Sequence, residues 1–190
     1  MNKNKFDVIR NILLLFILFA VCGWIYEVIW TYFDDGVWTN RGFLFGPWLP
    51  IYGFGGMLVY AIFRKQITKP FYVGKLNIRF VLLFIYVCLI TTFVELAATY
   101  IIELFGSPFT VLWDYSEHFM NFQGRICLDA SARFGVLGLM IIYGVLPIYR
   151  KLIAMKNQKL LNAISWTLIA LFAIDWILRI PFGNNYNGPI

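Results

Sequence analysis

Five long apolar runs constrain the fold of this 190-residue chain more than any other feature of its sequence. Each approaches or exceeds the roughly 20 residues that an α-helix needs to cross the hydrocarbon core of a bilayer. The runs cover approximately residues 12–33, 45–63, 80–105, 131–149 and 160–180. Only 14% of the residues are charged, whereas soluble domains carry about a quarter. The sequence therefore predicts one all-α integral membrane domain over residues 1–190, a polytopic bundle of five transmembrane helices.

The distribution of basic residues predicts how this bundle is oriented. Twelve of the sixteen lie before the first run, between the second and third, or between the fourth and fifth: Lys3, Lys5, Arg10, Arg64, Lys65, Lys69, Lys75, Arg79, Arg150, Lys151, Lys156 and Lys159. The positive-inside rule places these segments in the cytoplasm. We therefore expect a multi-pass protein of the cell membrane with its N-terminus inside and its C-terminus outside. Nine of the ten acidic residues fall on the outer side, so the net charge of +6 reflects topology and contact with anionic lipid; no nucleic-acid partner is expected.

The segment "NRGFLFGPWLPIYGFGG", residues 40–56, is unusual for a transmembrane helix. Gly42 and Gly46 form a small-xxx-small pair that favours close helix packing. Two prolines and three further glycines in the segment favour a kink or a break. Two interpretations stay open: a broken second helix that lines a polar outer cavity, and glycines that serve packing alone.

Two carboxylates lie at similar depth in the outer halves of two predicted helices. Glu27 is 15 residues from the start of the first run, and Glu95 is 15 residues from the start of the third. Thr91, Thr92 and Thr99 place hydroxyl groups near Glu95 on one helix face. A carboxylate inside the membrane indicates a function by default. The alternatives are a Glu27 that reaches headgroup water, and a Glu95 that is protonated or neutralised by an arginine.

The predicted outer loop at 106–130, "GSPFTVLWDYSEHFMNFQGRICLDA", mixes aromatic and hydrogen-bonding residues. It is predicted either as a lid or re-entrant segment or as an ordinary interfacial loop. His118 has no partner at a known metal-ligand spacing, so neither a metal site nor another cofactor is expected. Asp175 and Arg179 stand at i, i+4 in the fifth run, which predicts a local ion pair.

The motifs "GWIYEV", "NRGFLFGPWLPIYGFGG", "WDYS" and "NFQGRICL", together with Glu95, resemble a bacterial membrane family labelled putative ABC-transporter type IV, the CmpB-like permeases. The resemblance covers about residues 20–150. It implies a set of signature positions: Glu27, Asn40, Arg41, Gly42, Gly46, Pro47, Pro50, Tyr52, Gly53, Glu95, Trp113, Asp114, Tyr115, Ser116, Asn121 and Gly124. An ATP-driven system would need a separate nucleotide-binding subunit, because this chain has no phosphate-binding loop of the GxxxxGK[ST] type.

These observations favour a small transport or permease-like membrane protein with a polar ligand site in the outer half of the bilayer. The candidate ligand-binding residues are Glu27, Asn40, Arg41, Tyr52, Glu95, Trp113, Asp114, Tyr115, Asn121 and Arg125. Membrane lipid is an expected partner, and Gly42 with Gly46 allows for a homo-oligomer. Two alternatives stay open, namely an outer-leaflet enzyme acting on a lipid or lipid-linked substrate and a helper subunit of another membrane complex. No catalytic residue is assigned.

Overall fold

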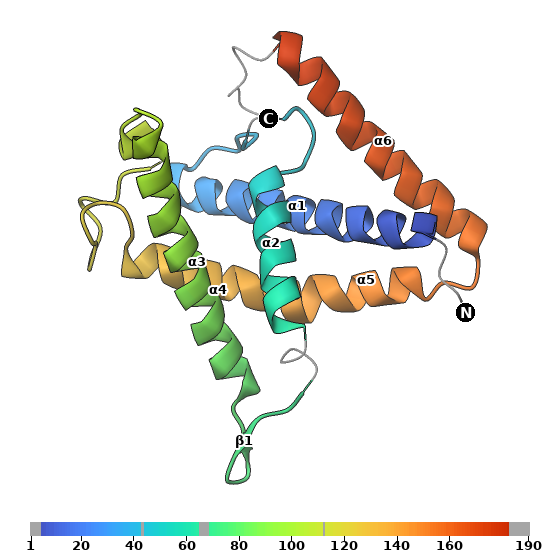
Figure 1. Ribbon diagram of the computed structural model, residues 1–190, viewed down its shortest axis with the longest axis horizontal. Coiled ribbons are helices and arrows are strands. Elements are labelled where there is room, and N and C mark those ends of the chain that lie inside the picture. Colours follow the sequence, from blue (N-terminus) through green and yellow to red (C-terminus); the bar gives the residue numbers. More distant parts are fainter. Residues whose placement is uncertain (1–4, 43, 65–68, 112, 183–190) are drawn as a thin grey trace. The chain divides into compact units, whose positions relative to one another are not determined.

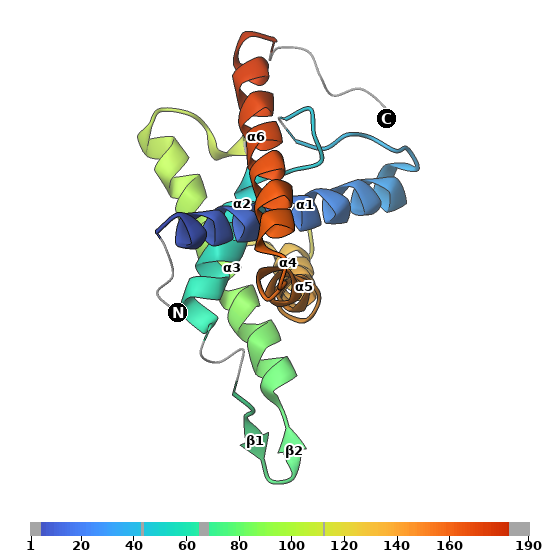
Figure 2. The same ribbon diagram turned by 90° about the vertical axis from the view of Figure 1, so that its right-hand side faces the viewer.

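The computed structural model describes residues 5–42, 44–64, 69–111 and 113–182 (Figure 1). The described elements, in chain order, are α1 (Lys5–Asp35), α2 (Pro50–Phe63), β1 (Tyr72–Val73), β2 (Leu76–Asn77), α3 (Arg79–Leu104), the 3-10 helix η1 (Phe109–Val111), α4 (Leu128–Met140), the π-helix η2 (Ile141–Val145), α5 (Leu146–Ile153) and α6 (Gln158–Phe182). β1 and β2 form an antiparallel hairpin, which is visible in Figure 2. The chain divides into two compact units, the first from residues 1–60 and 141–190 and the second from residues 61–140.

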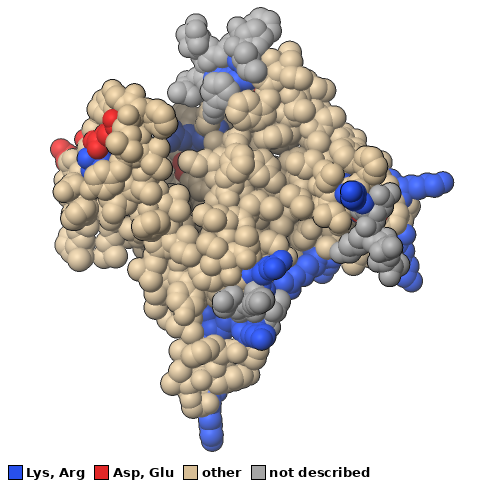
Figure 3. Space-filling model, in the orientation of Figure 1, with Lys and Arg blue, Asp and Glu red and all other residues tan. Residues whose placement is uncertain are grey.

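Four helices of the described part of the chain are long and apolar enough to cross a membrane. They run over Lys5–Phe33, Arg79–Leu104, Leu128–Ile153 and Gln158–Arg179. Large apolar side chains stand exposed along them, with Phe33 76% and Leu104 86% exposed. Most of the face in Figure 3 carries no charged side chain. An apolar surface of this extent suits lipid and not water, so the expectation of a helical membrane protein is confirmed.

The second predicted span differs from the expectation. A helix was predicted over 45–63, but residues 45–49 are not helical and α2 begins at Pro50. With 14 residues, α2 is about 21 Å long at about 1.5 Å per residue, shorter than the hydrocarbon core. The backbone N–H of Leu49 donates to the carbonyl of Ala20, the central residue of α1 (3.0 Å). The non-helical chain therefore returns along α1 to its middle before α2 starts, and a fifth full-length helix is not confirmed.

Glycines let α2 lie close against α1 in the first unit. A side-chain carbon built at Gly53 would overlap the ring of Phe16, and one built at Gly56 would overlap the ring of Phe19. The helix continues through these residues, so there is no break at the glycines, and the irregular backbone precedes the helix instead. Packing is therefore the role that the structure gives to Gly53 and Gly56.

In the second unit α3 packs on α4, again through glycines. Gly135 faces Phe84 and Cys88, and Gly138 faces the buried Val87. Near the same contact the Thr92 and Ser131 hydroxyls lie 2.6 Å apart. This pair of helices carries the loop of residues 105–127 that connects them.

Candidate functional site

In the first unit a buried aspartate binds the non-helical segment before α2. The Asp175 carboxylate, on α6, accepts hydrogen bonds from the Phe45 N–H (3.0 Å), the Gly46 N–H (2.7 Å) and the Trp48 indole N–H (2.6 Å). Asp175 is only 7% exposed. Irregular backbone within a membrane is tolerated where other parts of the protein form hydrogen bonds with its polar groups. Asp175 provides these hydrogen bonds for residues 45–48, which were predicted to be helical.

The i, i+4 spacing predicted a local ion pair of Asp175 with Arg179. It could not indicate the hydrogen bonds to this segment, because these partners of Asp175 lie about 130 residues earlier in the chain. The Arg179 guanidinium lies 4.9 Å from the centre of the Phe45 ring and so contacts the same segment. The predicted helix-packing role of Gly42 and Gly46 was wrong, since neither residue is helical. Gly42 has a φ of +95°, which favours glycine, and Gly46 lies against the Trp48 ring.

Glu27, on α1, forms the first polar cluster with Tyr52 and Arg41. The Tyr52 hydroxyl donates to Glu27 Oε1, and Arg41 Nε lies 3.8 Å from Glu27 Oε2. The side chains of Glu27 and Arg41 are 26% and 49% exposed, so this cluster is open to its surroundings. Four of the predicted ligand residues therefore lie in one place, because Asn40 adjoins Arg41 and accepts a hydrogen bond from the Trp24 indole (2.7 Å).

Gly23 lies one helical turn before Glu27 on α1. The space beside it is occupied by the Tyr52 ring, which a side-chain carbon at Gly23 would overlap. We expect Gly23→Ala to displace the Tyr52 ring, to break its hydrogen bond to Glu27 and to lower the free energy of unfolding by about 1–3 kcal/mol. Thermal unfolding of the detergent-solubilised protein measures the effect.

The matched control is Gly55→Ala, because no atom lies within 4 Å of a side-chain carbon built at that helical glycine. Alanine there should be neutral or stabilising by about 0.5–1 kcal/mol, since glycine is a poor helix former. Equal melting temperatures for the two variants would show that Tyr52 does not occupy the space beside Gly23.

In the second unit several predicted ligand residues fold the loop between α3 and α4. Asp114 accepts hydrogen bonds from the Ser116 backbone N–H (2.9 Å) and hydroxyl (2.5 Å), which lower the pKa of the exposed Asp114. The Asn121 amide donates to the carbonyls of Ser116 and His118 (3.0 Å each). Gly124, at a φ of +68°, is close enough to Ser116 and Asp114 to exclude a side chain. These residues fix the shape of the loop.

Arg125 attaches this loop to the end of α3. Its guanidinium contacts both oxygens of Glu103 (2.8 and 2.9 Å) and lies over the rings of Tyr100 (4.5 Å) and Phe109 (4.4 Å). Its backbone carbonyl accepts from the Trp113 indole (2.7 Å). The guanidinium is thus engaged in an ion pair and two cation–π contacts. Glu103, which the sequence did not single out, completes this anchor.

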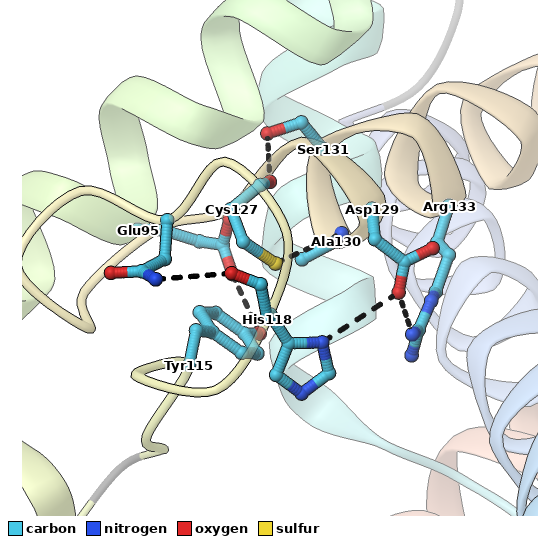
Figure 4. A network of polar contacts seen from close by, with 9 residues as sticks. Glu95, Tyr115, His118, Cys127, Asp129, Ala130, Ser131 and Arg133 are labelled. Atoms are coloured by element: carbon cyan, nitrogen blue, oxygen red, sulfur yellow. Dashed lines mark hydrogen bonds and ion pairs between the residues drawn. The ribbon is translucent and has the colours of Figure 1, made fainter.

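The loop places Tyr115 against Glu95 (Figure 4). The Tyr115 hydroxyl donates to Glu95 Oε1 at 3.2 Å. Burial raises the pKa of Tyr115, and the neighbouring Glu95 carboxylate raises it further, so the phenol stays a hydrogen-bond donor at neutral pH. Glu95 is 7% exposed, and within the described residues its buried Oε2 has no hydrogen-bond partner.

The threonine hydroxyls near Glu95 bond elsewhere. Thr91 donates to the carbonyls of Val87 (2.8 Å) and Cys88 (3.1 Å), and Thr99 donates to that of Leu96 (2.7 Å). The Ser131 hydroxyl donates to the Cys127 carbonyl (2.9 Å), so Thr92 can donate to Ser131. The hydroxyl groups of these threonines therefore form their hydrogen bonds with other groups and not with the Glu95 carboxylate.

A second polar group lies beside this contact in Figure 4. His118 Nδ1 is 3.9 Å from Asp129 Oδ2, and the same carboxylate oxygen accepts a hydrogen bond from Arg133. All three side chains are at least a quarter exposed. This arrangement is that of an ion-pair cluster at the start of α4.

The predicted ligand residues thus form two groups, one in each unit. Glu27, Asn40, Arg41 and Tyr52 lie in the first. Glu95 lies in the second, with the loop residues Trp113, Asp114, Tyr115, Asn121 and Arg125, of which Tyr115 contacts Glu95. A lid or re-entrant role for the loop stays a prediction.

Comparison with known proteins gives one result for this chain. The model of the family described as "Putative ABC-transporter type IV" matches residues 14–180. This match is wider than residues 20–150, which carried the resemblance, and it includes Asp175. No curated protein and no solved structure matches the chain.

Proposed function

The chain belongs to the putative ABC-transporter type IV family, and from this premise we propose that it is a small permease-like component of a transport system in the cell membrane. In this proposal the four long helices cross the membrane, and the fifth crossing is made by the non-helical residues 45–49 together with α2. The positive-inside rule supports a cytoplasmic N-terminus and an outer C-terminus for this arrangement. A cytoplasmic nucleotide-binding subunit would supply the energy.

The buried carboxylate of Glu95 carries the proposal of a polar ligand site. A carboxylate at membrane depth is costly unless its oxygens are paired or a cation or proton is bound. Tyr115 pairs with only one oxygen, and the other is buried without a partner among the described residues. This free oxygen supports binding of a proton or of the cationic group of a small solute.

Tyr115 is the proposed gate of this site. It belongs to a loop whose fold is fixed by Asp114, Asn121 and Gly124, and it reaches Glu95 through a single hydrogen bond. A long hydrogen bond of 3.2 Å between a phenol and a carboxylate can be exchanged for a ligand without breaking the loop. The residues that were expected to bind ligand directly would therefore hold Tyr115 in place.

The alternatives have weaker support. An outer-leaflet enzyme would need a general base aligned on a substrate. The nearest arrangement of this kind is His118 beside Asp129, but the same Asp129 oxygen also pairs with Arg133, as in an ordinary ion-pair cluster. A helper subunit would place its functional surface against another membrane protein. It predicts that loss of that protein, and not of the Glu95 carboxylate, abolishes activity.

The test uses purified protein at a series of pH values and with a panel of monovalent cations and small cationic solutes. A ligand present at about 100 times its Kd should stabilise the wild type by roughly 2.7 kcal/mol in thermal unfolding. Glu95→Gln should fold but lose this response, and Tyr115→Phe should retain binding with altered affinity. Glu117→Gln removes an exposed charge from the same loop and serves as the matched control.

Uptake of the stabilising solute into proteoliposomes then distinguishes transport from binding. Uptake by the wild type and Glu117→Gln but not by Glu95→Gln supports the proposal. An unchanged ligand response in Glu95→Gln would contradict it. A Glu95→Gln variant that melts far below the wild type without ligand would show that the carboxylate has a structural role.

A further inference from the structure

A second, apolar site lies along the Asp35-proximal half of α1, in the first unit. It is a groove of about 460 Å³ lined by Trp24, Ile25, Val28, Ile29 and Trp38. Its volume falls within the range of small-molecule sites in proteins. The proposed function rests on Glu95 in the other unit and makes no use of this groove.

Both aromatic walls of the groove are held by contacts outside it. The Trp24 indole N–H donates to Asn40 Oδ1 (2.7 Å), so the polar atom of this side chain is already satisfied. Trp38 stacks on Tyr32 with the ring centres 4.3 Å apart and the planes 16° from parallel. The groove is therefore preformed and offers an apolar occupant aromatic and aliphatic surface.

The groove is placed where it would meet lipid. It covers more than one turn of a helix that is apolar enough to cross a membrane, and Ile25, Ile29 and Trp38 are each about half exposed. An occupant that enters such a groove from the bilayer needs an apolar chain. The distribution of basic residues puts this half of α1 in the outer leaflet.

A cation, Arg41, lies three residues after Trp38, on the segment that forms one wall of the groove. Arg41 follows Asn40, which holds Trp24, and its Nε lies 3.8 Å from Glu27, a residue between the groove residues Trp24 and Val28 in sequence. The Arg41 side chain is 49% exposed, so its remaining N–H groups can reach a second anion. Guanidinium groups bind phosphate through paired hydrogen bonds.

We propose that this groove binds one acyl chain of a phospholipid whose phosphate contacts Arg41. The two parts of the lipid match the two parts of the site, since the chain fits the apolar groove and the anionic phosphate meets the exposed cation. The sequence singled out Arg41 but not the groove, because Trp24 and Trp38 resemble ordinary interfacial aromatics.

The test is native mass spectrometry of the full chain after delipidation and addition of phosphatidylglycerol, or of diacylglycerol with the same acyl chains. Ile29→Trp fills the groove with a larger apolar side chain, and Ile12→Trp makes the same change at an exposed position of α1 outside the groove. Arg41→Gln removes the cation. Melting temperatures of the variants are compared first, so that only folded protein is analysed.

We expect the wild type and Ile12→Trp to retain one phosphatidylglycerol at detergent concentrations that remove other lipids, and Ile29→Trp to lose it. Arg41→Gln should weaken phosphatidylglycerol binding about tenfold while leaving diacylglycerol binding unchanged. Equal retention in Ile29→Trp and Ile12→Trp would overturn the groove as the site. Equal affinity of the wild type for the two lipids would overturn the phosphate contact.

Discussion

Asp175→Ala is expected to lower the free energy of unfolding by about 3 kcal/mol or more, because three N–H groups lose their acceptor together. Each buried donor left without a partner costs about 1–3 kcal/mol. The donors are the backbone N–H groups of Phe45 and Gly46 and the indole of Trp48. The cost should be greatest within the membrane, where water cannot replace the carboxylate.

Thermal unfolding in detergent, with the near-ultraviolet circular dichroism of the tryptophans, measures this effect. Asp175→Asn keeps one acceptor oxygen and should fall between alanine and the wild type. Glu117→Gln removes a charge from an exposed position and should change nothing. A melting temperature of Asp175→Ala equal to that of the wild type would mean that the segment before α2 does not depend on this carboxylate.

Gly138→Ala is expected to destabilise the packing of α3 on α4 by about 1–3 kcal/mol, the usual cost of overfilling a packed core. A side-chain carbon at Gly138 would lie 2.5 Å from Val87 Cγ1 and 2.8 Å from Cγ2. Val87 is 1% exposed and branched at Cβ, so it has little freedom to move away.

The control for this change is Gly144→Ala, further along the same run of helix, where no atom lies within 4 Å of a built side-chain carbon. It should be neutral or slightly stabilising. Urea unfolding of the two variants, monitored by circular dichroism, gives the comparison. Equal midpoints, or a larger loss at Gly144, would contradict the close contact between Gly138 and Val87.

The long helices could be predicted from the sequence because continuous apolar character determines them locally. The run at 80–105 corresponds to α3 (Arg79–Leu104) and the run at 160–180 to α6 (Gln158–Phe182). The start of α2 could not be predicted in this way. Residues 45–49 are apolar enough for a span, and their irregular backbone depends on Asp175 and Ala20, which are distant in sequence.

The sequence pointed to polar residues that interact with one another in the structure, but it did not show what each of them contacts. The sequence pointed to Glu95 and Tyr115, and the structure joins them by a hydrogen bond. It also pointed to Arg125 and Asn121 as ligand-binding groups. In the structure Arg125 anchors the loop on Glu103, and Asn121 binds the loop's own backbone. The sequence shows that a polar side chain lies in an apolar run, where burial without a hydrogen bond is unfavourable, but only the fold shows which group forms that hydrogen bond.

The central question is whether Glu95 can be reached by a ligand or is sealed within the protein. A hydrophobic carbodiimide added to the membrane-embedded protein modifies carboxyl groups that accept a proton in an apolar environment, and peptide mass spectrometry locates the product. We expect modification at Glu95 and protection by the solute that stabilises the wild type. A Glu95 that stays unmodified at every pH at which the protein remains folded would contradict it.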